Sequence, residues 1–202
     1  MAINVANNNS LSAITALPSA VSGGAMTLLE TQTASSSSTI SFTSNIDDTY
    51  DEYMFKFYDI HPATDDVEFR IKFSIDGGSN YNATVTSTVF YARHYEDDST
   101  AALGYHASMD EAQGTSGQQL SRSIGNGNDE SFCGTVHLFS PSSTTFVKHF
   151  ISRGHEYTSV NNEARDYFVS GYVNSTSAVD AIQFAMSSGN IDAGTFKLYG
   201  VS

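Results

Sequence analysis

The stretch that decides the fold is VEFRIKFSID, residues 67–76. Its apolar residues fall at every second position, and the residues between them are polar or charged. Successive side chains of a β-strand point to opposite faces, so this period of two predicts a strand with one buried and one wet face. The face predicted to be buried consists of Val67, Phe69, Ile71, Phe73 and Ile75.

This strand runs into a strong turn signal, DGGSN at residues 76–80. Gly77 and Gly78 supply the positive φ angles that a tight reversal requires. A β-branched run, ATVTSTVFYARHY at residues 83–95, follows the turn. The sequence therefore predicts a β-hairpin over residues 67–95.

The same period predicts strands along the rest of the chain, separated by turns that contain Gly, Pro, Asn, Asp or Ser. No run of ten or more residues has a helical period with sound caps, so the chain is expected to be all-β. About ten antiparallel strands without crossover helices predict a β-sandwich, with a jelly roll as the expected topology. The further strands are expected at residues 26–33, 39–44, 52–60, 119–124, 132–139, 145–153, 166–173, 179–186 and 194–201. Register should be fixed by the inward side chains of Phe55, Phe57, Phe69, Phe73, Phe184 and Leu198.

Two segments differ from these strands. Residues 1–25 are uncharged and rich in Asn, Ser and Ala, so we expect an extended N-terminal arm at 1–25 and a single β-sandwich domain at 26–202. The arm is either a tail without contacts or a segment that lies along a neighbouring subunit. Residues 96–118 are expected to be irregular, as a functional loop or a mobile insertion. The apolar residues that would anchor the arm are Ile3, Val5, Leu11, Ile14 and Leu17.

Charge and cysteine content exclude several classes of protein. Twenty-two acidic and nine basic residues give a net charge of −13, which repels phosphate backbones, so no nucleic-acid partner is expected. No window approaches the length of an apolar membrane helix, so no membrane insertion is expected. The single cysteine, Cys133, excludes an intramolecular disulfide and is expected to be a small buried apolar group. The N-terminus lacks the features of a secretory signal, which predicts synthesis in a cytoplasm and export by another route.

Motifs for catalysis are missing from the sequence, and we expect a protein that is not an enzyme. The histidines show neither HxH nor HExxH spacing, and no serine lies in a GxSxG elbow. Acidic pairs such as Asp47-Asp48 and Asp65-Asp66 could include a glycosidase acid and base, although turn and solvation roles are simpler. No metal or other cofactor is expected. Calcium is the alternative at the oxygen-rich stretches 45–52 and 125–130, neither of which matches an EF-hand.

Aromatic residues gather on either side of the start of segment 96–118. Flat aromatic rings beside hydrogen-bonding groups suit a glycan, whereas tyrosines at strand edges are also common as purely structural residues. The absence of tryptophan counts against a dedicated carbohydrate-binding module. The residues of this predicted receptor or glycan patch are Tyr91, His94, Tyr95, Tyr105 and His106.

Three stretches resemble small virion structural proteins of tailed bacteriophages, especially marine ones. They are ITALPSAVSGGAMTLLETQTASSSSTISFTSNIDDTYDEYMFKF (14–57), FSIDGGSNY (73–81) and QFAMSSGNIDAGTFKLYGV (183–201). The resemblance implies a tail-associated or tail-fibre protein, or a decoration protein of the capsid surface. Such a protein is made in the host cytoplasm, released by lysis, and exposed on the virion.

Partners and rival functions are hypotheses beside this resemblance, with the first rival based on the predicted glycan patch and the second on the acidic pairs. The partners would be further copies of the chain, expected as a homotrimer, and other virion proteins that hold the arm. A carbohydrate-binding adhesin that attaches to host surface glycan is the first alternative, and a glycan depolymerase is the second. The resemblance implies no catalytic residues.

Overall fold

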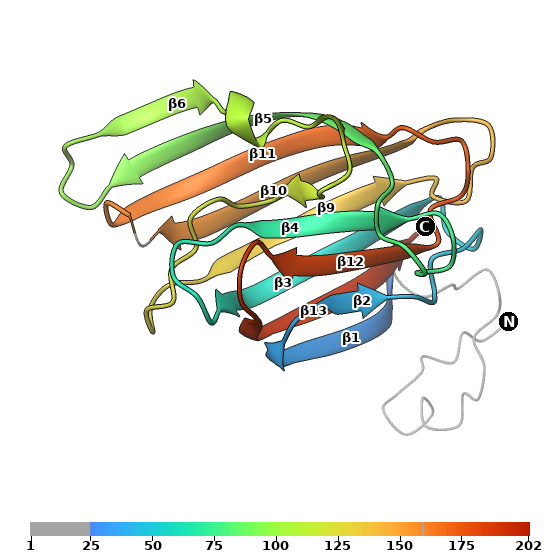
Figure 1. Ribbon diagram of the computed structural model, residues 1–202, viewed down its shortest axis with the longest axis horizontal. Coiled ribbons are helices and arrows are strands. Elements are labelled where there is room, and N and C mark those ends of the chain that lie inside the picture. Colours follow the sequence, from blue (N-terminus) through green and yellow to red (C-terminus); the bar gives the residue numbers. More distant parts are fainter. Residues whose placement is uncertain (1–24, 159) are drawn as a thin grey trace, which may run out of the picture.

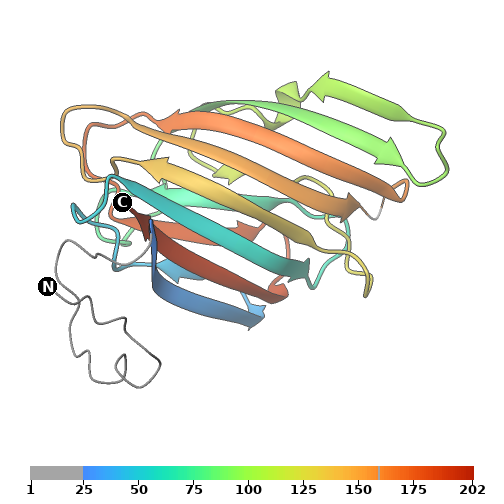
Figure 2. The ribbon, with the colours of Figure 1, turned by 180° about the vertical axis from the view of Figure 1, so that it is seen from behind.

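The computed structural model describes residues 25–158 and 160–202. They form two antiparallel sheets that pack face to face (Figures 1 and 2). The large sheet has the order β1-β13-β3-β9-β10-β11-β5-β6, with β7 also paired to β5, and the small sheet has the order β2-β12-β4-β8. The predicted antiparallel β-sandwich is confirmed, whereas the jelly-roll topology stays a prediction.

The described residues contain thirteen strands, more than the sequence predicted, and one 3-10 turn at Ala107–Met109. The bounds of the strands are β1 Met26–Ser37, β2 Ile40–Phe42, β3 Glu52–Pro62, β4 Phe69–Ser74, β5 Val85–Tyr95, β6 Ala101–Tyr105, β7 Ala112–Gly114, β8 Gln118–Gln119, β9 Phe132–Phe139, β10 Lys148–Thr158, β11 Glu163–Val173, β12 Ala181–Met186 and β13 Ile191–Val201.

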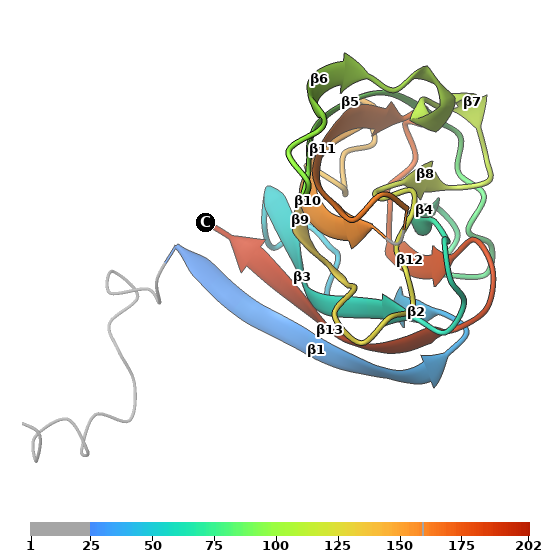
Figure 3. The same cartoon turned by 90° about the vertical axis from the view of Figure 1, so that its left-hand side faces the viewer.

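The core lies between the two sheets and is dominated by phenylalanine. The large sheet curves around the small one (Figure 3). Buried side chains from both sheets form one cluster between them. Phe184 of β12 lies at its centre, with ring centroids of Phe57, Phe69 and Phe196 at 5.0, 5.8 and 5.6 Å. Burying one phenylalanine contributes about 1.5–3 kcal/mol. The six side chains predicted to point inward are all at most 2% exposed, which confirms that part of the prediction.

Glycine makes room for one of these rings. Gly134 of β9 lies opposite Gly154 of β10 in the antiparallel register. The ring of Phe132 occupies the space where a side chain at either position would lie. A Cβ added to either glycine would be within 3.1 Å of a ring carbon. Phe132 in turn packs against Phe57 and Phe69. The two glycines therefore allow a buried ring to lie flat on the sheet.

The hairpin predicted over residues 67–95 is wrong. β4 pairs with β12 and β8 in the small sheet, whereas β5 pairs with β11, β6 and β7 in the large sheet. The predicted reversal does form, since Gly77 and Gly78 have φ angles of +71° and +79° and Asp76 accepts a hydrogen bond from the Asn80 amide at 2.9 Å. The chain then crosses to the other sheet. β4 and β5 thus bury their apolar faces from opposite sides of the core instead of pairing with each other. Ile75, predicted to be buried, lies after β4 at the start of this reversal and is 37% exposed.

Segment 96–118 is not irregular, and that prediction is also wrong. It contains β6, the 3-10 turn, β7 and the start of β8. Asp110 accepts a hydrogen bond from the Val89 amide at 2.8 Å, and the Glu111 amide donates one to Ser87 Oγ at 2.9 Å. Met109 is buried in the core. These contacts tie the segment to β5.

The last described strand, β13, lies inside the large sheet between β1 and β3. Phe196 and Leu198 point into the core, as the sequence predicted. The register shifts around Gly194, whose φ of +131° favours glycine and where a Cβ would lie 2.7 Å from Ile60 of β3. β13 is thus an interior strand with partners on both sides.

The prediction that Cys133 is buried is wrong. Cys133 is exposed, because the even-numbered residues of β9 face the core and Cys133 faces outward. The proposed anchors Ile3, Val5, Leu11, Ile14 and Leu17 lie outside the described residues, so the function of the arm stays a prediction. Among the described residues, no helix is long and apolar enough to span a membrane.

Candidate functional site

The sheet divides the predicted glycan patch between its two faces. On β5, Val85 and Val89 are buried, so odd-numbered residues such as Tyr91 and Tyr95 lie on the inner face. His106 joins them there, with its ring centroid 5.3 Å from that of Tyr91. His94 and Tyr105 lie on the outer face. The five residues therefore do not form one surface.

The inner-face members of the patch adjoin a buried network of charged groups. Glu156, Arg165 and Arg93 face one another across β10, β11 and β5. Tyr167 donates a hydrogen bond to Glu156 at 3.0 Å and accepts one from Arg165 at 3.0 Å, and Arg165 also donates to Glu163. Both glutamates are fully buried.

Burial governs the protonation of this network. It raises the pKa of Glu156 above its usual value, and the nearby Ser121 hydroxyl and Arg165 charge only partly oppose that effect. Burial and the Glu156 charge also raise the pKa of Tyr167. Breaking one partner of such a network is costly, so its clearest effect is to fix how β10, β11 and β5 align.

A hollow that sequence reasoning missed lies elsewhere among the described residues. It has a volume of about 630 Å³ and opens between the segment before β3 and the β9–β10 loop. A second hollow of about 550 Å³ lies over the outer face of β5, β10 and β11, and His149 lines both. We call the two together the groove. Its first part is lined by Asp48, Tyr50, Asp51, Phe139, Ser140, Ser142, Ser143, Phe146, Val147 and His149.

Main-chain hydrogen bonds hold the β9–β10 loop in place beside the groove. The Ser140 amide donates to the Asp51 carbonyl at 2.6 Å, and the Val179 amide donates to the Pro141 carbonyl at 2.9 Å. Ser143 Oγ accepts hydrogen bonds from the amides of Thr145 and Phe146 at 3.3 and 3.1 Å. Such side-chain turns fix a loop locally.

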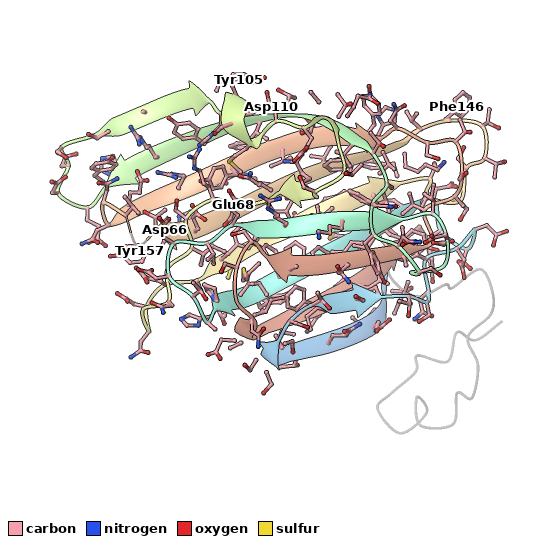
Figure 4. All side chains as sticks on the ribbon, in the orientation of Figure 1. Asp66, Glu68, Tyr105, Asp110, Phe146 and Tyr157 are labelled. Atoms are coloured by element: carbon pink, nitrogen blue, oxygen red, sulfur yellow. The ribbon has the colours of Figure 1, made fainter. Side chains whose placement is uncertain are left out.

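The loop presents one aromatic ring to solvent. Phe146 is 72% exposed and lies on the loop at the far end of the molecule from Tyr157 (Figure 4). The sequence predicted a strand starting at residue 145, whereas β10 begins at Lys148. The sequence feature that could have predicted an exposed ring on a loop is the phenylalanine directly after the Ser- and Thr-rich run SPSSTT.

An apolar strip lies on the same outer face, directly beyond the second hollow, because Phe90 lies two residues after Thr88 on β5 and Phe168 two residues before Ser170 on β11. The rings of Phe90 and Phe168 stack in parallel with centroids 4.7 Å apart, and the Arg153 guanidinium lies 4.9 Å from the Phe168 ring. Next to them on β6, Leu103 and Tyr105 are 76% and 63% exposed. We call Phe90, Leu103, Tyr105 and Phe168 the outer-face strip.

Oxygen-rich turns that suggested calcium are occupied by internal hydrogen bonds. In residues 45–52, Asp47 accepts from Tyr53 and from the Thr49 amide, at 2.9 Å each. In residues 125–130, Glu130 accepts from the Gly127 amide at 2.6 Å. No group of three His, Cys, Asp or Glu side chains suited to a metal occurs among the described residues. The expectation of a protein without a metal stays a prediction.

Comparisons with known proteins place the chain in no family. No protein-family model and no curated protein matches it. A crystal structure of a Bacteroides ovatus protein of unknown function is similar over 52% of this chain, with 7% identity and a TM-score of 0.28. The match spans 45% of that protein, less than half its length. A likeness at this level supports no conclusion about function.

Proposed function

We propose that this chain is a structural protein of a tailed-bacteriophage virion, a homo-oligomeric β-sandwich module on the tail or the capsid surface. The observation that carries the proposal is the outer-face strip, where Phe90 of β5 and Leu103 and Tyr105 of β6 are left to solvent beside the half-buried Phe168 of β11. Contiguous exposed apolar surface on a soluble protein marks an interaction site. A second copy of the chain is the partner that would cover it, within an expected trimer.

The sequence supports the same proposal. The stretches that resemble phage virion proteins include β1, the turn after β4, and β13, which are parts that build the sandwich. A chain with one cysteine needs no oxidising compartment to fold. A net charge of −13 favours solubility for a protein displayed on a particle surface.

The oligomer is tested by charge insertion into the strip. Leu103→Glu should convert the oligomer to a folded monomer in size-exclusion chromatography with light scattering, because a buried unpaired charge is costly. Ile75→Glu, at an exposed apolar residue next to the small sheet and away from the strip, is the control and should leave the oligomer intact. A wild-type protein that is monomeric at micromolar concentrations would refute assembly through the strip.

The location is tested on particles. Mass spectrometry of purified virions should detect the chain, and electron microscopy at side-chain resolution should place it on the tail or capsid surface. Deletion of residues 2–24 should abolish incorporation and leave the sandwich folded. Absence of the chain from purified virions would refute the proposal as a whole.

A further inference from the structure

We propose that the groove binds an uncharged, hydroxyl-rich chain, namely a neutral oligosaccharide. None of its lining residues belongs to the outer-face strip, and the inference does not depend on the assembly proposed above. The volume of its first part, about 630 Å³, lies within the range of small-molecule sites, which is about 300–1,000 Å³. The occupant is therefore a small or narrow ligand rather than a protein surface.

The lining combines aromatic faces with hydrogen-bonding groups. Phe146, Tyr50 and Phe139 supply rings against which the C–H face of a sugar can pack. The carboxylates of Asp48 and Asp51 accept hydrogen bonds and can bind sugar hydroxyls, which are donors. Phe146 is the strongest indication, because a ring that is 72% exposed gains most when a ligand covers it.

Charge selects among ligands of this kind. Asp48 and Asp51 line the first part of the groove, and neither part has a lysine or arginine among its lining residues. Two carboxylates and a net charge of −13 disfavour uronic acids and sulfated sugars. The ligand that fits is neutral.

The second hollow extends the site along one direction. Past His149, the groove continues over Thr86, Thr88 and Ser170, whose hydroxyls both donate and accept hydrogen bonds. The ring of Tyr172 flanks this path and lies 6.3 Å from that of His149. The shape suits several linked sugar rings better than one.

The experiment uses the full chain with defined probes. Cellohexaose, maltohexaose and xylohexaose are titrated by calorimetry and by saturation-transfer NMR, and an oligogalacturonate hexamer serves as the anionic counterpart. We expect at least one neutral hexasaccharide to bind, and the anionic hexamer to bind at least about tenfold more weakly.

Variants assign the binding to the groove. Phe146→Ala should weaken binding by about tenfold or more, because it removes the exposed ring, and Asp48→Ala should weaken it as well. Both residues are exposed, so thermal unfolding should be unchanged and should show that each variant folds. Leu103→Ala removes an equally exposed apolar side chain at the other end of the sheet and should bind like the wild type.

Several results would overturn the inference. They are the failure of all three neutral probes to bind, binding that Phe146→Ala leaves unchanged, or equal affinity for the anionic hexamer. Binding of a trilysine peptide in place of any sugar would assign the groove to cationic peptides. Release of shortened sugars during the titration would assign it to hydrolysis rather than to binding.

Discussion

Replacing Gly154 with alanine should destabilise the sandwich through one ring. A Cβ on Gly154 would lie 2.2 and 2.3 Å from two ring carbons of Phe132, well inside van der Waals contact. The ring cannot move aside, because the rings of Phe57 and Phe69 pack against it with centroids at 6.1 and 5.4 Å. Overpacking a core costs about 1–3 kcal/mol, and the upper end applies here. Alanine stabilises a strand by about 0.5–1 kcal/mol relative to glycine, because it loses less backbone entropy on folding. The net decrease in the free energy of unfolding is therefore about 2 kcal/mol.

This loss is measurable by urea unfolding followed by circular dichroism, and it corresponds to a fall in Tm of about 4–8 °C for a chain of this size. His155→Ala, at the neighbouring outward residue, is the control and should change the free energy of unfolding by less than about 0.5 kcal/mol. In a double-mutant cycle, Phe132→Leu should relieve the clash, so the two losses should sum to at least about 1 kcal/mol more than the loss of the double variant. Wild-type stability of Gly154→Ala, or strict additivity with Phe132→Leu, would refute the reasoning.

Three further outcomes are expected. Phe184→Ala should lower the free energy of unfolding by about 4–5 kcal/mol, because it removes the central ring of the core. Phe146→Ala should change the free energy of unfolding by less than about 0.5 kcal/mol. A difference below about 2 kcal/mol between the two variants would contradict the packing described. Because burial raises the pKa of Glu156 in the folded state above its usual 4.5, its contribution to stability is full below pH 4.5 and is lost as the pH rises through the folded-state value. Glu156→Gln should therefore gain stability relative to the wild type as the pH rises in urea titrations, and a difference that does not vary with pH would contradict this. Partial burial and then the Asp59 charge raise the pKa of the Cys133 thiol, so Asp59→Asn should speed its reaction with a disulfide reagent at pH 8, and an unchanged rate would argue against that charge effect.

The sequence predicted which side chains face the core better than it predicted which strands pair. Alternation alone places Phe55 and Phe184 inside, because burial of one strand face is a local property. The partner of β4 is not local: a turn such as DGGSN reverses the chain equally well for a hairpin and for a crossing between sheets. The exposure of Cys133 could have been predicted, since Phe132 and Val136 of the same strand have the opposite parity.

The groove could not be predicted from the sequence, for a similar reason. Its lining comes from residues 48–51 and from residues 139–149, which meet only because β3 pairs with β9. The predicted patch used residues that are close in sequence, and the pleat then sent His94 and Tyr91 to opposite faces. Strands β6 and β7 were missed because they have only five and three residues, too few to show a period, and the strand predicted at 119–124 is reduced to β8, Gln118–Gln119.

The position of β13 between β1 and β3 also sets the order in which the protein can be completed. During synthesis, β1 and β3 leave the ribosome early, but the strand that joins them is not available until residues 191–201 have been made. Until then, the two strands, of twelve and eleven residues, have backbone edges that lack the partner they will have in the finished sheet. Closure of the large sheet is therefore a late, non-local step, and folding should be slow for a chain of this length. In that interval, the β13 of a neighbouring nascent chain can fill the same gap, so crowded synthesis favours exchange of this strand between copies.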